Sequence, residues 1–137
     1  MNSNNHIKAI FFDLDGTLID TADEFVVVVQ ALRAEHDREP LPEDIIRSNV
    51  SNGARALTSL ALELPESAPQ FEEKRLRLLA LYSDVLGTVA ALYPGIQELL
   101  DGLSQRGIAW GIATNKPRLY TEPLLARLKL SPAPGVI

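Results

Sequence analysis

The feature that most constrains the fold of this chain is a short apolar run that ends in two acidic residues. Ile7 to Phe12 is rich in β-branched and aromatic residues, and Asp13-Leu14-Asp15-Gly16-Thr17 follows it directly. A nearly continuous apolar run of this length is typical of a strand buried on both faces, as in a parallel sheet. Residues two apart in extended backbone point to the same side, so we expect both carboxylates to face one cleft. Ligands bind at the carboxyl ends of strands in such sheets.

The second half of the chain alternates between helix and strand patterns. Ile96 to Gln105 predicts a helix, Ile108 to Ala113 predicts a second apolar strand, and Arg118 to Leu128 predicts another helix. Pro123 suggests a late start or a kink in that last helix. Val136-Ile137 is the predicted start of a third strand. Strands separated by helices predict a parallel α/β sheet.

The block of roughly 70 residues between the two predicted strands is expected to be helical throughout, and it is much longer than a normal crossover. Its expected helix boundaries are Asp20 or Thr21 as the first cap, Ser51 as a later cap, and Phe71 to Leu86 as a helix stopped by Gly87. We therefore predict an inserted all-helical unit over residues 21–88, and an α/β unit formed by residues 1–20 and 89–137.

Composition excludes several classes of function. The formal net charge is −5 and no block of Lys and Arg stands out, which argues against a nucleic-acid surface and a polybasic membrane patch. The absence of cysteine excludes disulfides, thiolate zinc sites and a cysteine nucleophile. The longest apolar run, Phe25 to Val29, is far shorter than the ~20 residues of a membrane-spanning helix. We therefore expect a cytoplasmic globular protein with no nucleic-acid or membrane partner.

The residues alone leave two interpretations of the acidic pair open. Asp13 or Asp15 could simply cap a helix in an ordinary strand-to-helix turn, because acids and glycine are common in turns. Alternatively, two carboxylates facing one cleft can divide the roles of nucleophile or metal ligand and of proton donor and acceptor. Gly16 would then let the backbone approach a bound anion closely.

Two sequence strings decide between these interpretations. Phe11-Phe12-Asp13-Leu14-Asp15-Gly16-Thr17-Leu18 resembles the first signature of the haloacid dehalogenase-like (HAD) hydrolase superfamily. Ile112-Ala113-Thr114-Asn115-Lys116 resembles the second signature, a hydrophobic strand that ends in Thr or Ser. The helical insert between them matches the position of the family's mobile helical cap. The resemblance covers nearly the whole chain and implies a Rossmann-like parallel-sheet core, here incomplete, with an inserted all-helical cap.

The resemblance also implies the chemistry of the site. Asp13 would attack a phosphoryl group to give an aspartyl phosphate, and Asp15 would protonate the leaving oxygen and then activate water. Thr114 would hydrogen-bond a phosphoryl oxygen. Mg²⁺ would bind the Asp13 carboxylate and the Asp15 backbone carbonyl. Dehalogenases of the superfamily lack the second acid, so the resemblance implies a phosphatase.

Further strings indicate a class of substrate. Thr114-Asn115-Lys116-Pro117 and the cap type are most similar to phosphoglycolate phosphatase and its relatives, which implies that Asn115 and Lys116 lie at the phosphate. Ser51-Asn52-Gly53-Ala54-Arg55 resembles a string in N-acetylmuramic acid 6-phosphate phosphatases, and Arg55 would contact the distal group of a small phosphorylated metabolite. The alternatives are a solvated Lys116, a solvated Arg55, and a phosphomutase that shares the first motif.

The family also uses a later Lys and a later acidic cluster, and no segment of residues 1–137 matches either. We therefore expect the N-terminal portion of a longer enzyme, with little activity when taken alone, or else a non-catalytic phosphate-binding fragment. Ile7, Ile10 and Phe11 would lack apolar partners, each worth about 1.5–3 kcal/mol when buried. The exposed edge of this strand would invite self-association.

Overall fold

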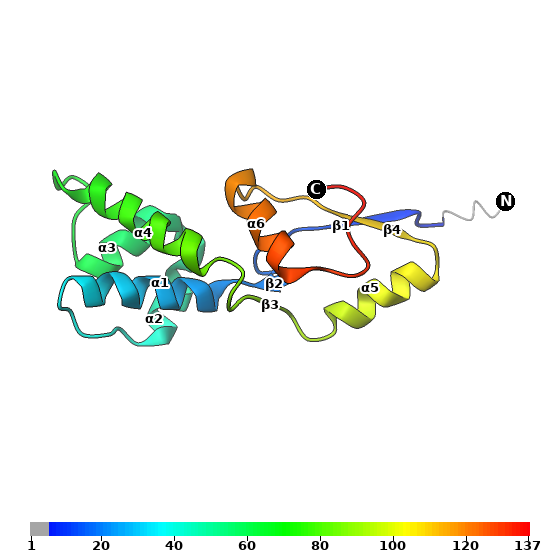
Figure 1. The fold of residues 1–137 in the computed structure, drawn as a ribbon, viewed down its shortest axis with the longest axis horizontal. Coiled ribbons are helices and arrows are strands. Elements are labelled where there is room, and N and C mark those ends of the chain that lie inside the picture. The colour runs from blue at the N-terminus through cyan, green and yellow to red at the C-terminus, as the bar shows by residue number, and fades with distance from the viewer. Residues whose placement is uncertain (1–5) are drawn as a thin grey trace. The chain divides into compact units, whose positions relative to one another are not determined.

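The computed structural model describes residues 6–137, which divide into two compact units. The α/β unit contains the described residues up to Asp20 together with Ala91–Ile137, and the helical unit is Thr21–Ala90 (Figure 1). That the helical unit acts as a cap remains a prediction. No helix in the described part of the chain is long and apolar enough to cross a membrane.

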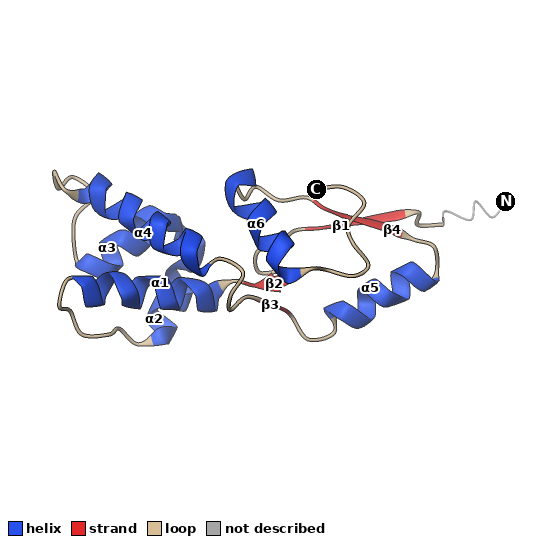
Figure 2. Ribbon diagram, viewed as in Figure 1, coloured by secondary structure: helices blue, strands red, loops and turns tan. Residues whose placement is uncertain are grey.

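A parallel pair of strands organises the α/β unit. Strand β1 (Ala9–Phe12) lies beside β4 (Ala109–Ile112) (Figure 2). The two strands pair with Phe12 opposite Ile112 at their carboxyl ends. The Ala113 N–H donates to the Phe12 carbonyl at 2.9 Å and continues the ladder past both strands. The predicted α/β class with a parallel sheet is therefore confirmed.

The helices in the described part of this unit are α5 (Ile96–Gln105) and α6 (Arg118–Leu128), with the bounds that the apolar pattern predicts. The late start suggested by Pro123 is wrong, because α6 runs through this residue. A proline removes a single helical N–H donor. Thr121 is buried, and its hydroxyl donates to the Pro117 carbonyl at 3.1 Å. This side-chain hydrogen bond stabilises the first turn of α6.

The expectation that the first strand is buried on both faces is wrong for the described residues. Ile7 is 65% exposed and Phe11 is 60% exposed. Among the residues that the structure describes, β4 is the only strand paired with β1, so one edge and part of a face lack cover. A Cβ atom added at Gly111 would lie 2.8 Å from the Phe11 ring and 2.9 Å from Val136, so the missing side chain lets both pack against β4.

The third predicted strand is present only as a hydrogen-bonded segment. The Gly135 N–H donates to the Trp110 carbonyl at 2.8 Å, and the Ile112 N–H donates to the Val136 carbonyl at 3.0 Å. Both bonds lie on β4, which therefore has partners on both of its edges. The segment does not extend into a regular strand.

A second, very short sheet was not predicted from the sequence. Strands β2 (Ile19–Asp20) and β3 (Ala91–Leu92) pair in antiparallel fashion, with Ile19 opposite Leu92. They lie in the α/β unit, directly next to the two points where the chain passes between the units. The Tyr93 N–H donates to the Leu18 carbonyl at 3.1 Å and extends this pairing by one bond.

Helices make up the regular structure of the second unit. They are α1 (Ala22–Glu35), α2 (Glu43–Asn49), the 3₁₀ turn η1 (Val50–Asn52), α3 (Gly53–Leu62) and α4 (Phe71–Val85). Their shared core contains fully buried aliphatic side chains from four helices, Val29, Leu32, Ile46, Leu57 and Leu78. The Phe25 and Tyr82 rings stack at 4.4 Å between α1 and α4. Helical spacing of apolar residues thus produces the helical structure expected for this block.

One of the three cap expectations in this unit is wrong, and the expectation for Thr21 holds for its position but not for a capping bond. Ser51 lies inside η1, and Asn52 is the N-cap of α3 instead. The backbone of Gly53 has φ of 88°, so the chain breaks between the 3₁₀ turn and α3. Thr21 is the N-cap of α1 but makes no side-chain capping hydrogen bond. Gly87, with φ of 77°, follows the end of α4 as predicted.

An exposed ion pair joins α1 to α4. The Arg77 Nε–H lies 3.1 Å from both carboxylate oxygens of Glu35. This hydrogen-bonded partner lowers the pKa of Glu35 from its usual value. The pair therefore stabilises the helical unit above the ordinary pKa of glutamate, and its contribution falls as the pH drops through the lowered value.

Arg33 stabilises the helical unit by hydrogen bonds to backbone carbonyls. It is 8% exposed, and its Nε and Nη1 donate to the carbonyls of Glu39 at 2.6 Å and Ala61 at 2.7 Å. The Ala61 carbonyl is among the last four of α3, which lack helical partners.

We expect Arg33→Met to lower the free energy of unfolding by about 2–4 kcal/mol in urea denaturation, because both carbonyls lose their donors. Arg47→Met, which removes an exposed ion pair with Asp23, should cost less than about 1 kcal/mol. Equal losses in the two variants would contradict this role.

Candidate active site

The acidic pair lies in a tight turn immediately after β1. The N–H groups of Thr17, Leu18 and Ile19 all donate to the Leu14 carbonyl, at 3.2, 3.1 and 3.2 Å. Gly16 has φ of 76°, a conformation that glycine adopts without strain. This turn leaves Asp13 exposed, and its Oδ1 accepts the Leu14 N–H at 2.8 Å.

The second motif forms a turn immediately after β4. The Thr114 hydroxyl oxygen accepts the Lys116 N–H at 3.1 Å, which fixes the path of the chain from β4 toward α6. A hydroxyl that accepts one bond still has its own hydrogen to donate to a ligand. Asn115 is exposed between these two residues. Because β1 and β4 are parallel and end opposite each other, Asp13 and Thr114 both follow the same edge of the sheet.

A salt bridge joins the two motifs. The Lys116 Nζ lies 3.3 Å from Oδ1 and 3.4 Å from Oδ2 of Asp15. The Lys116 side chain is only 7% exposed, and that of Asp15 is 37% exposed. The alternative of a solvated Lys116 at a helix start is therefore wrong. The structure brings Asp15, Thr114 and Lys116 into one site from positions that are 101 residues apart in the sequence.

A pocket of about 310 Å³ lies beside this salt bridge, in the α/β unit. Its polar lining comes from Thr114 and Lys116 and from three residues of α6, Arg118, Thr121 and Glu122; Ile112, Ala113 and Ile137 complete it. Hydroxyl, ammonium and guanidinium groups are donors for an anion. The pocket thus has the size for a small ligand, with Thr114, Lys116 and Arg118 as donors and the Glu122 carboxylate as a negative group, and its lining includes neither Asp13 nor Asp15.

The α6 residues of this pocket were not predicted from the sequence. Arg118 and Thr121 are three residues apart, and Arg118 and Glu122 are four apart, so they share one helix face. Arg118 also donates to Glu122 at 3.0 Å. They could have been predicted from the sequence, because the helix expected from Arg118 begins two residues after Lys116 and its first turns therefore lie at the same edge of the sheet.

Arg55 lies in the helical unit and has partners there. Its Nε donates to Glu66 at 3.0 Å, its Nη1 lies 3.9 Å from Glu72, and its guanidinium lies 5.2 Å from the centre of the Phe71 ring. The side chain is 54% exposed, so it is accessible but ion-paired. A role of Arg55 in ligand binding remains a prediction.

Comparisons with known proteins match nearly the whole chain to one family. A family described as haloacid dehalogenase-like hydrolase matches residues 7–135. The chain is 41% identical over 122 residues to the N-acetylmuramic acid 6-phosphate phosphatase of Pseudomonas aeruginosa, covering 89% of this chain and 54% of that protein. It is 36% identical over 121 residues to a phosphoglycolate phosphatase of Xanthomonas campestris pv. campestris, covering 88% and 54%. A solved haloacid dehalogenase-like hydrolase from Streptococcus pneumoniae superposes with a TM-score of 0.76 at 25% identity, covering 96% and 60%.

The chain belongs to the haloacid dehalogenase-like hydrolase family, which confirms the resemblance carried by its two motifs. It spans about half the length of the curated relatives it matches.

Proposed function

We propose that the protein is a phosphatase that hydrolyses small phosphorylated metabolites through Asp13. The observation that carries this proposal is the salt bridge between the two motifs. Lys116 lies with Thr114 in the turn after β4, and its ammonium group bonds Asp15 in the turn after β1. What supports the proposal is that Asp13 and Thr114 follow the paired carboxyl ends of β1 and β4, and that Asp15 is bonded to Lys116 there.

The proposed reaction proceeds in two displacements. A carboxylate oxygen of Asp13 attacks phosphorus, the bond from phosphorus to the ester oxygen breaks, and protonated Asp15 gives its proton to that oxygen. Asp15 then takes a proton from water, the water oxygen attacks phosphorus, and the bond to Asp13 breaks to release inorganic phosphate. Thr114 donates to a phosphoryl oxygen throughout, and the Lys116 ammonium group donates to an Asp15 oxygen and holds that side chain in place, whether Asp15 is protonated or ionised.

We propose Mg²⁺ as the cofactor. The Asp13 carboxylate and the Asp15 backbone carbonyl are hard oxygen donors of the kind that Mg²⁺ prefers, and this ion is commonly bound through one or two carboxylates, waters and a substrate phosphate. In the part of the chain that the structure describes, no group of three or more His, Cys, Asp or Glu could hold a metal. The two donors fit such a water-rich site, where Mg²⁺ would neutralise charge on the phosphoryl group.

The substrate is proposed to be like 2-phosphoglycolate. A second candidate is N-acetylmuramic acid 6-phosphate, favoured by the 41% identity to a phosphatase named for it. A phosphomutase, which would return the phosphoryl group to a sugar, is the remaining alternative. Zero cysteines suit a reducing compartment, and we propose that the reaction takes place in the cytoplasm.

A substrate panel tests this proposal in the full-length protein. We expect Mg²⁺-dependent phosphate release with kcat/KM at least about tenfold higher for the preferred ester than for p-nitrophenyl phosphate. The panel contains 2-phosphoglycolate, N-acetylmuramic acid 6-phosphate and N-acetylglucosamine 6-phosphate, which lacks the lactyl carboxylate and serves as the matched control. Transfer to sugar without release of phosphate would favour the mutase. Phosphate binding without turnover of any ester would favour a non-catalytic role.

Arg55 is proposed to contact the distal group of the substrate. Arg55→Ala should then lower kcat/KM on the preferred ester by about tenfold or more, because a charged hydrogen bond is lost, and leave p-nitrophenyl phosphate nearly unaffected. Arg75→Ala is the control, because Arg75 pairs with Glu72 in the same unit. Equal losses on both esters would contradict substrate contact and assign Arg55 to the packing of Glu66 and Phe71.

A further inference from the structure

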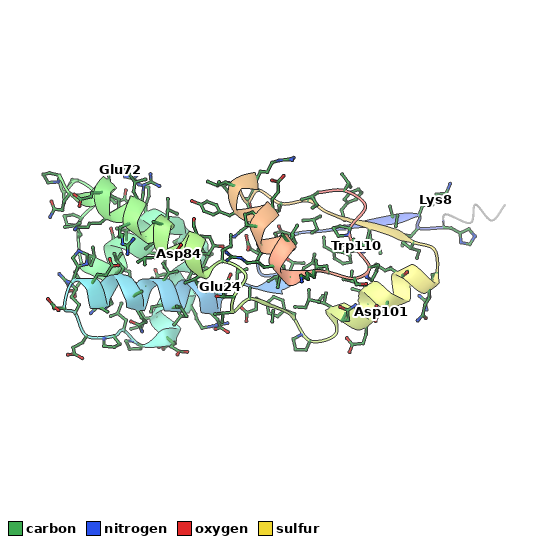
Figure 3. The ribbon with its side chains drawn as sticks, viewed as in Figure 1. Lys8, Glu24, Glu72, Asp84, Asp101 and Trp110 are labelled. Atoms are coloured by element: carbon green, nitrogen blue, oxygen red, sulfur yellow. The ribbon has the colours of Figure 1, made fainter. Side chains whose placement is uncertain are left out.

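A buried carboxylate lies outside the proposed active site, at the start of the helical unit. Glu24 is 0% exposed and belongs to the first turn of α1 (Figure 3). Its Oε2 accepts the backbone N–H groups of Thr88 at 3.0 Å and of Val89 at 3.2 Å. Its Oε1 is buried without a hydrogen-bond partner among the described residues.

The position of Glu24 in the sequence predicts a different partner. Thr21-Ala22-Asp23-Glu24 has the spacing of a capping box, in which the glutamate would accept the N–H of the N-cap residue. In the structure Thr21 makes no side-chain capping bond to α1. The Glu24 carboxylate instead accepts the N–H groups of Thr88 and Val89, which are 64 and 65 residues further along the chain. Burying a carboxylate with one unpaired oxygen costs free energy, so stabilising α1 alone does not account for this arrangement.

The two amides that Glu24 binds lie at the other end of the helical unit. The chain enters this unit at Thr21, just before Glu24, and leaves it at Ala90, just after Val89. Glu24 therefore bonds the entering segment to the leaving segment. On the α/β side of the same two crossings, β2 and β3 pair Asp20 with Ala91. The entering and leaving segments are thus bonded to each other both by backbone pairing and by a buried carboxylate.

We propose that Glu24 is a positioning residue that makes the two connecting segments move as one. The inference rests on the proposed phosphatase function. If the entering and leaving segments moved independently, the helical unit could adopt many arrangements during a catalytic cycle. Because the two segments are bonded to each other, the number of arrangements is smaller. Glu24 acts through the connection and touches no substrate, so its effect is the same for every ester.

Glu24→Gln tests this inference in the full-length protein, with Asp23→Asn as the matched control. Asp23 is the adjacent acid in the same helical turn, with a side chain that is 52% exposed and paired with Arg47. We expect Glu24→Gln to speed hydrogen exchange of the Thr88 and Val89 amides by about tenfold or more. We also expect kcat to fall about tenfold on both p-nitrophenyl phosphate and the preferred ester, with KM changed less than about twofold. Asp23→Asn should change neither quantity.

Glu24→Asp keeps the negative charge but shortens the reach by one methylene. It should reproduce both effects, and it also replaces Glu24→Gln if that variant does not fold. Unchanged hydrogen exchange at the Thr88 and Val89 amides would overturn the proposal that Glu24 holds the two connecting segments together. Faster exchange with unchanged kcat, measured well below each melting temperature, would overturn the positioning role. If the wild-type protein hydrolyses no phosphate ester, the proposed function fails, and the exchange data still decide whether the two segments are clamped.

Discussion

Asp13→Asn is expected to reduce kcat/KM for phosphate release by about 10³-fold or more, because an amide cannot act as the attacking oxygen nucleophile. The residue is exposed at the end of β1, so its replacement should leave the fold intact. The measurement is phosphate release from p-nitrophenyl phosphate and from the preferred ester at saturating Mg²⁺. Circular dichroism should show wild-type melting for the variant.

Asp101→Asn provides the control for the charge change. Asp101 is exposed on α5 and accepts a hydrogen bond from Gln97 in the same unit. It should retain wild-type activity. Full activity in Asp13→Asn would exclude an aspartyl phosphate at this position.

Lys116→Met is expected to reduce kcat/KM by about 10²-fold, comparable to the loss of one preorganised donor in an active site. The Lys116 side chain is nearly buried, and its ammonium group is bonded to both oxygens of Asp15. Methionine keeps the apolar stem and removes the charge. If Lys116 mainly positions Asp15, kcat falls; if it mainly binds the phosphoryl group, KM rises.

Lys116→Arg and Lys129→Met complete this experiment. Arginine restores a positive charge at position 116 and should recover part of the lost activity. Lys129 is an exposed lysine of the same unit, at the end of α6, and its replacement should have no effect. Wild-type kinetics for Lys116→Met would mean that the salt bridge only stabilises the fold.

The sequence predicted those helices and strands whose position depends only on residues close to one another in the chain. The bounds of α5 and α6 follow from apolar spacing, and the two parallel strands follow from short apolar runs. α4 ends at Val85, and Gly87 follows with a positive φ in the turn that leads away from the helix. These features depend on residues within a few positions of each other, which is why the sequence alone suffices for them.

Features that depend on distant contacts were missed or wrong. The two-residue strands β2 and β3 are too short to leave a pattern, and they exist because Ile19 meets Leu92. The burial of β1 depends on what covers Phe11, and its apolar composition cannot report that. The 3₁₀ turn before α3 replaced the helix start expected at Ser51, because Gly53 has a positive φ and an extended ψ that interrupt the helical backbone.

The same distinction holds within the site. The string that contains Asp13 and Asp15 was recognisable by itself, whereas the partner of Asp15 was not. Lys116 was expected at most as a neighbour of the phosphate, and its bond to Asp15 appears only when β1 and β4 lie side by side. The buried Glu24 fits a local capping pattern and is bonded elsewhere. Long-range pairs of charged groups are therefore where the structure adds most.

The central claim, that Asp13 carries the phosphoryl group, is tested most directly by trapping the intermediate. The full-length protein is mixed with Mg²⁺ and the preferred ester, quenched in acid, and reduced with borohydride, which converts an aspartyl phosphate to homoserine. Peptide mass spectrometry then locates the reduced residue. The account predicts homoserine at position 13 in the wild-type protein and none in Asp13→Asn. Homoserine at another aspartate, or none during active turnover, would contradict it.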